Sequence, residues 1–293
     1  MHLMARAAII ATSVLLASPA VGQQQQPDES ASEIVVTGAR VRAEQVRDFV
    51  SVLGPPGADS IPRFIDQVCP VTVGLTPAQG EAVNARLRRV AEAIGLNVAG
   101  PKCAPNAIVI VTGDKRAFIE LLARRRRHSF GAMSSSEIRR LARSPGPAAA
   151  WQLMGPVDRD GVPLQFDHAA GVYINRTTDP PSRLNSVSPQ AFDASAMVIE
   201  AGALAVLTPN QLADYAAMRL FARLDPARLP VPAPPTILNI LEAPPGSAVP
   251  LTLTKWDFGL LRGLYASSFA LRASGQRSQI ARQVTRQLDE PDP

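Results

Sequence analysis

Cysteine, histidine and long apolar runs are all scarce in this chain of 293 residues. Two cysteines are too few for a disulfide-rich miniature scaffold. Three histidines, one of which is His2 in a segment that we expect to be removed, leave too few for a three-histidine zinc site. No apolar run after residue 22 is long enough to span a bilayer. Because 46% of the residues are apolar, the chain is not wholly disordered and can bury the core of one or two domains.

The first 22 residues are typical of a secretory signal peptide. Arg6 precedes the apolar run 7–17, and the small residues of 18–22 offer cleavage sites after Ala20 or Gly22. An uncleaved anchor is the alternative, but the run is shorter than the roughly 20 residues that a bilayer requires. The sequence therefore predicts a periplasmic or secreted protein.

Positive charge is in modest excess and comes almost entirely from arginine. The formal net charge is +5, with 27 arginines against three lysines. An exported protein seldom meets nucleic acid, so we do not expect a nucleic-acid partner. Anionic envelope polymers or lipids are the partners that such a charge would favour.

A strand, a helix and a second strand follow one another between residues 69 and 112. The runs 69–73 and 106–112 are β-prone, and the helix between them begins with a capping signal at Thr76. This order predicts a βαβ unit with two parallel strands, whose starts are neighbours at one edge of the sheet.

Cys69 and Cys103 stand at or just before the two predicted strand starts. Adjacent strands lie about 4.8 Å apart, which suits the Cα separation that a disulfide requires. In an oxidising compartment we expect the two residues to form a disulfide. A redox role is disfavoured, since no C-x-x-C motif is present.

The remaining chain divides by composition. Residues 23–42 are predicted to be a flexible leader, residues 43–270 an α+β domain, and residues 271–293 a polar C-terminal tail with one amphipathic stretch near Ile280. Within the leader, Glu33–Gly38 resembles the TonB box of outer-membrane receptors, an extended segment that pairs with a sheet edge of TonB. The alternative is an edge strand of the domain itself.

Four consecutive arginines, Arg124, Arg125, Arg126 and Arg127, end a predicted helix that begins at Asp114. Cations at a helix C-terminus complement its partial negative charge, which is one explanation for them. The other is an anion patch that binds an anionic lipid or a polysaccharide phosphate.

The C-terminal half contains a buried strand ending at Glu200, a helix 211–221 that is apolar on nearly all sides, the turn 236–238 and a closing helix 254–265. Both helices carry capping signals, at Thr208 and Thr254. The sequence thus predicts a single α+β domain with a mixed sheet, a central buried helix and C-terminal helices.

This order of elements resembles the C-terminal half of secreted zincin metallopeptidases. In that family the central helix carries H-E-x-x-H, and a turn containing Met follows it. On this alignment Gln211 and Tyr215 replace the two zinc-binding histidines, Leu212 replaces the general base, and Leu238 replaces the Met. The likeness implies a zincin-like scaffold without its metal site, because an amide and a neutral phenol are weak zinc ligands.

If Gln211 and Tyr215 line a cleft beside Glu200, the resemblance implies that a peptide-binding groove persists there. We predict no catalytic residues, cofactor or metal. The chain has no G-x-S-x-G nucleophile motif and no glycine-rich phosphate loop, although paired carboxylates for glycoside hydrolysis need no fixed spacing.

The sequence favours an exported, non-catalytic envelope protein that binds a peptide, a protein or TonB. The chain also resembles short secreted Gram-negative proteins with an E-I-V-V-T-G leader. Two alternatives are a diverged hydrolase on a zincin-like scaffold and a TonB-interacting accessory protein.

Overall fold

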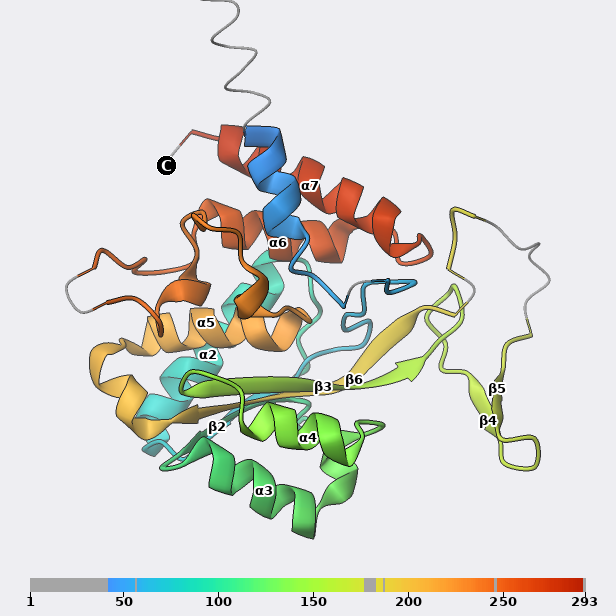
Figure 1. Ribbon diagram of the computed structural model, residues 1–293, viewed down its shortest axis with the longest axis horizontal. Coiled ribbons are helices and arrows are strands. Elements are labelled where there is room, and N and C mark those ends of the chain that lie inside the picture. Colours follow the sequence, from blue (N-terminus) through green and yellow to red (C-terminus); the bar gives the residue numbers. More distant parts are fainter. Residues whose placement is uncertain (1–41, 56, 177–182, 187, 245–246, 292–293) are drawn as a thin grey trace, which may run out of the picture. The chain divides into compact units, whose positions relative to one another are not determined.

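The computed structural model describes residues 42–55, 57–176, 183–186, 188–244 and 247–291 (Figure 1). The predicted signal peptide, nearly all of the predicted leader and the TonB-box-like segment Glu33–Gly38 lie outside the described residues. None of the helices described here is both long and apolar enough to cross a membrane.

A mixed four-stranded sheet lies at the centre of the domain, as the α+β prediction requires. The strands occur in the order β1, β2, β6, β3; the first three are parallel and β3 is antiparallel to β6. Their bounds are Pro70–Val73 for β1, Ala107–Thr112 for β2, Ala148–Pro156 for β3 and Gln190–Glu200 for β6.

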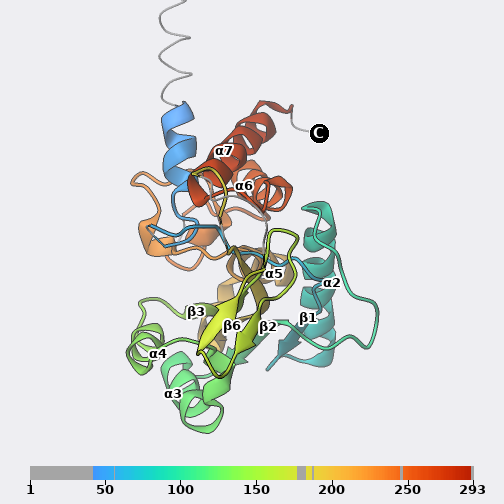
Figure 2. The ribbon, with the colours of Figure 1, turned by 90° about the vertical axis from the view of Figure 1, so that its right-hand side faces the viewer.

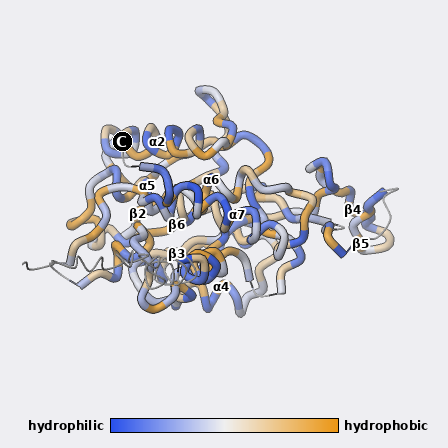
Figure 3. The backbone as a smooth tube through the Cα atoms, turned by 90° about the horizontal axis from the view of Figure 1, so that it is seen from above, coloured by the Kyte–Doolittle hydropathy of each residue, from blue (hydrophilic) through white to orange (hydrophobic). Residues whose placement is uncertain are grey.

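The predicted βαβ unit is confirmed by β1, helix α2 (Pro77–Ala93) and β2. Thr76 and Gln79 form the capping box that starts α2. The buried side chains of α2 recur at helical spacing and include Val83, Leu87 and Val90, and in Figure 3 hydrophobic and hydrophilic positions alternate along this helix. In the strand register Pro70 pairs with Ala107, so the two strand starts are neighbours.

The alternation of side chains along β6 divides the interior into two cores. Met197 and Ile199 belong to the core that contains α2 and helix α5 (Pro209–Phe221). Ala196 and Val198 face the other way, into a smaller core with helices α3 and α4. The bounds of these two helices are Lys115–Arg125 and Ser135–Ala142, and they lie on the opposite side of the sheet from α5 (Figure 1).

The prediction of a central buried helix is confirmed by α5. Ten of its thirteen residues are buried, and it contacts α2, the sheet and helix α6 (Lys255–Ala266). Thr208 caps α5, and Thr254 caps α6 with Asp257 at the third helical position, as the sequence predicted.

Most of the segment predicted as a polar tail, residues 271–293, is helical. Helix α7 (Ala273–Asp289) packs on α6 and buries Ile280 and Val284 in the main core. The close approach depends on two glycines of α6. A Cβ on Gly259 would lie 2.9 Å from the Cα of Val284, and one on Gly263 would lie 3.0 Å from the Cα of Ile280.

A further helix over residues 42–50 begins the described chain (Figure 2). Its Val46, Phe49 and Val50 are buried, and the Phe49 ring meets Trp256 of α6 edge-on at 5.5 Å between centroids. The remaining short elements are the hairpin strands β4 (Gln165–Asp167) and β5 (Val172–Ile174) and the 3₁₀ helices η1 (Arg127–Phe130), η2 (Ala201–Val206), η3 (Pro226–Arg228) and η4 (Ile237–Asn239).

Candidate functional site

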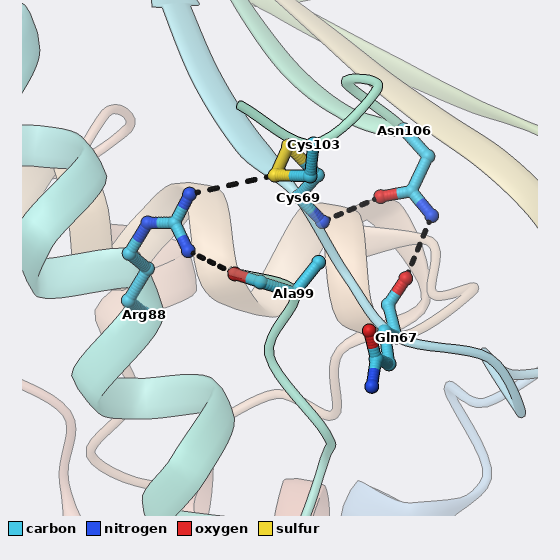
Figure 4. The surroundings of a disulfide bond; sticks show 6 residues. All are labelled: Gln67, Cys69, Arg88, Ala99, Cys103 and Asn106. Atoms are coloured by element: carbon cyan, nitrogen blue, oxygen red, sulfur yellow. Dashed lines mark hydrogen bonds between the residues drawn. A yellow bond between two sulfur atoms is a disulfide. The ribbon is translucent and has the colours of Figure 1, made fainter. Parts of the chain in front are cut away.

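The disulfide between Cys69 and Cys103 is confirmed, with their Cα atoms 6.0 Å apart at the start of the βαβ unit (Figure 4). The Asn106 side chain fixes the strand entry, because it accepts a hydrogen bond from the Cys69 N–H at 2.7 Å and donates one to the Gln67 carbonyl. The Arg88 guanidinium of α2 contacts the Cys103 sulfur. These contacts indicate a structural role for the disulfide.

Gln211 has a structural position at the start of α5. Its side-chain oxygen accepts a hydrogen bond from the Thr208 N–H at 3.0 Å, and its side-chain nitrogen donates to the Pro250 carbonyl at 2.9 Å. Leu212 beside it is buried in the main core. Both polar ends of the Gln211 amide are therefore used by the fold.

Tyr215 lies one turn further along α5 and pairs with Arg219. The Arg219 guanidinium donates a hydrogen bond to the Tyr215 hydroxyl at 2.7 Å. Burial raises the pKa of Tyr215, and the neighbouring Arg219 opposes that shift. Both residues line a cavity of about 90 Å³ with Glu242. Ligand pockets usually hold about 300–1,000 Å³, so this space is too small for a peptide.

Glu200, at the end of β6, has hydrogen-bond partners of its own. Its carboxylate accepts a hydrogen bond from the backbone N–H of Lys115 at 3.1 Å. The Lys115 ammonium is buried and donates to the carbonyls of Ser144 and Gly146, and its burial lowers its pKa. Gln211, Tyr215 and Glu200 therefore each have separate hydrogen-bond partners, and a groove shared by all three stays a prediction.

The predicted anion patch is exposed at the end of α3. Arg124 and Arg125 are the last two residues of the helix, as the dipole explanation requires. Arg127 is already engaged, since its guanidinium donates to the carbonyls of Gly131 and Met133. Arg127 is therefore partly used by the fold, and anion binding by this patch stays a prediction.

Two buried carboxylates outside the predicted site residues are engaged in hydrogen bonds within the fold. Asp214 forms a two-bond ion pair with Arg86, with N···O distances of 2.8 and 3.0 Å, and also accepts from the Thr252 hydroxyl. Asp257 accepts from the backbone N–H groups of Ile237 and Thr254. Within the described part of the chain no group of three or more His, Cys, Asp or Glu is placed to hold a metal ion.

A cavity of about 720 Å³ lies between the helix over residues 42–50 and α7, and we call it the α7 groove. The two helices run in roughly opposite senses (Figures 1 and 2), and side-chain contacts join them near both ends. Arg42 pairs with Asp289 at 2.9 Å, and Arg277 donates to the Leu53 carbonyl at 2.9 Å.

Small and aliphatic side chains line the α7 groove between these two connections. Val46 and Val50, both almost fully buried, lie at its base on the first helix, and the partly exposed Ala281 and Thr285 line it from α7. The opposite stripe of α7, with Ile280, packs on α6 and fixes the helix in place. The α7 groove therefore has an apolar floor on a rigid support, which is the usual form of a ligand pocket.

Four arginines surround the α7 groove: Arg47, Arg277, Arg282 and Arg286. None of the described residues that line it carries a carboxylate. Burial, and then the neighbouring Arg228, lower the pKa of Arg277, which indicates that positive charges gather at this end. Sequence reasoning missed this site because its two helices lie more than 200 residues apart in the chain.

No family model, curated protein or solved structure matches the chain. The zincin-like resemblance therefore stays a prediction from the sequence, and the function has to be argued from the molecule itself.

Proposed function

We propose that the protein is an exported, non-catalytic envelope protein that acts by binding a ligand in the α7 groove. The observation that carries this proposal is the cavity itself: about 720 Å³, an apolar floor and a rim of arginines. That volume is within the usual range of ligand pockets, about 300–1,000 Å³.

The disulfide supports the compartment part of the proposal. Disulfides persist in the periplasm and outside the cell, whereas cytosolic thiols are kept reduced. The signal-like layout of residues 1–22 is an independent argument for export.

The contacts of the buried polar groups support a binding role over catalysis. Asp214 and Asp257 are committed to hydrogen bonds that hold α5, α6 and the loops between them. Gln211 has both amide atoms in the capping of α5 and its contact with Pro250. A general acid or base needs a free position beside its substrate, and these groups have none.

Titration with the fluorescent apolar probe N-phenyl-1-naphthylamine tests the proposal. The purified protein should bind one probe molecule per chain. Ala281→Trp fills the α7 groove and should weaken binding at least tenfold, whereas Leu121→Trp, on the exposed side of α3, should leave it unchanged. The urea midpoint of each variant controls for folding.

Two results would reject the proposal. If the wild-type protein does not bind the probe, or binds it as well after Ala281→Trp, the α7 groove is not a ligand site. Turnover of a peptide or ester substrate would favour the diverged hydrolase instead.

A further inference from the structure

We propose that the ligand of the α7 groove is a free single-chain anionic amphiphile of the fatty-acid type, with its acyl chain on the apolar floor and its anionic head among the arginines. This inference rests on the proposed function and adds the chemical class of the ligand. It follows from the charge of the lining residues, from the dimensions of the α7 groove and from the contacts that join its two helices.

Charge complementarity is the first argument. Among the described residues, four guanidinium groups and no carboxylate line the α7 groove. The acidic residues of the first helix, Glu44 and Asp48, are not among the lining residues, although both are exposed. Unlike charges attract strongly where the surroundings exclude water, so an anion is favoured here and a cation is excluded.

The availability of the arginines is the second argument. No side chain of the described residues accepts a hydrogen bond from Arg47 or Arg282, and Arg286 donates only to the neutral Gln283 side chain. By contrast, Arg86 and Arg42 each pair with an aspartate. Guanidinium groups can bind a carboxylate through two parallel hydrogen bonds, so the rim offers a head-group site that the fold has not used.

The dimensions of the α7 groove select a single chain. Its lining on α7 extends from Ser274 to Arg286, which is about 18 Å at 1.5 Å per residue and suits an acyl chain of about 14 carbons. The connections Arg42–Asp289 and Arg277–Leu53 join the helices on either side of the floor. A free, one-chain molecule fits this space better than a two-chain lipid held in a bilayer.

The small residues of α7 explain why the floor is open. Ser274, Ser278, Ala281 and Thr285 recur at helical spacing on the side of α7 that faces the first helix. Larger side chains on this stripe would fill the space between the helices. The small size of the four side chains that are present gives the acyl chain room without a movement of the backbone.

Competition with N-phenyl-1-naphthylamine tests the inference, using myristate against tetradecanol and tetradecylamine. The three compounds share one chain length and differ in the charge of the head. Myristate should displace the probe at least tenfold more tightly than tetradecanol, and tetradecylamine should compete least. Added salt should weaken myristate much more than tetradecanol.

Charge reversal tests the role of the rim. Arg282→Glu with Arg286→Glu should weaken myristate binding at least tenfold while the probe still binds. Arg124→Glu with Arg125→Glu, an equal charge change on exposed arginines of α3, should leave myristate binding unchanged.

The outcomes separate this inference from the proposed function. If the probe binds and Ala281→Trp abolishes its binding, but the three amphiphiles compete equally, the ligand class is wrong and the binding function stands. If neither the probe nor myristate binds, both fail. Sedimentation with anionic phosphatidylglycerol vesicles that depends on Arg282 and Arg286, without binding of free myristate, would assign the surface to a membrane and overturn the inference.

Discussion

The packing of α7 on α6 allows a sharp test with one substitution at two sites. Gly80 in α2 and Gly263 in α6 are both helical, and Gly→Ala raises helix propensity at each by up to about 1 kcal/mol. Their surroundings differ. A Cβ on Gly80 would lie 3.6 Å from the Thr72 carbonyl oxygen, an ordinary contact, whereas one on Gly263 would lie 3.0 Å from the Cα of Ile280.

Gly80→Ala should therefore stabilise the protein by up to about 1 kcal/mol. Gly263→Ala has the same gain in helix propensity, but the backbone of α7 must move to make room for the new Cβ. Overpacking of this kind lowers the stability of a protein by about 1–3 kcal/mol. The free energies of unfolding of the two variants should thus differ by about 1–3 kcal/mol, with Gly263→Ala the less stable.

Urea unfolding followed by circular dichroism, with the disulfide intact, measures this difference. The comparison between the two variants cancels the shared propensity term. Equal stabilities would refute the close packing of α7 on α6, and with it the rigid floor of the α7 groove.

Three further predictions concern buried groups. Replacing Cys69 and Cys103 by Ser should lower the free energy of unfolding by about 3–4 kcal/mol, measured in urea without reductant. Asp214→Ala should lower the free energy of unfolding by about 3 kcal/mol in the same assay. The substitution removes the acceptor of the half-buried Arg86 guanidinium, of the Thr252 hydroxyl and of the Leu253 N–H. Burial raises the pKa of Asp257, so the folded state holds that proton more tightly than the unfolded chain. Stability should fall as pH rises from about 4 through the raised pKa, and Asp257→Asn should remove this slope in a pH series of urea titrations.

Local signals allowed much of the fold to be predicted. The capping patterns at Thr76, Thr208 and Thr254 start helices in the structure because side chains satisfy otherwise unpaired N–H groups within one turn. The pairing of Cys69 with Cys103 followed from the geometry of parallel strands, a constraint that spans only 34 residues.

The same local logic explains the position of Gln211. The pattern Thr208-Pro209-Asn210-Gln211 indicates a capping box, and the structure shows that role. The resemblance gave Gln211 a second role that its contacts do not support. The i, i+4 spacing of Tyr215 and Arg219 was visible in the sequence and could have indicated their hydrogen bond.

Polarity alone does not show whether the segment after residue 270 packs on the core. Only one stripe of α7 is buried, and its polar members Gln276 and Gln287 are buried there as well. Gly259 and Gly263, which allow α7 to pack closely, lie on another helix, α6. The α7 groove needs this helix and the one over residues 42–50, so no local pattern could show it.

A crystal structure of the protein with a brominated myristate tests the central claim most directly. The anomalous signal of bromine locates the acyl chain without interpretation of weak density. We predict a bromine peak beside Val46 and Ala281, with the carboxylate against the guanidinium groups of the rim. A well-occupied bromine peak elsewhere, with the space between residues 42–50 and α7 filled by the chain's own residues, would contradict the account.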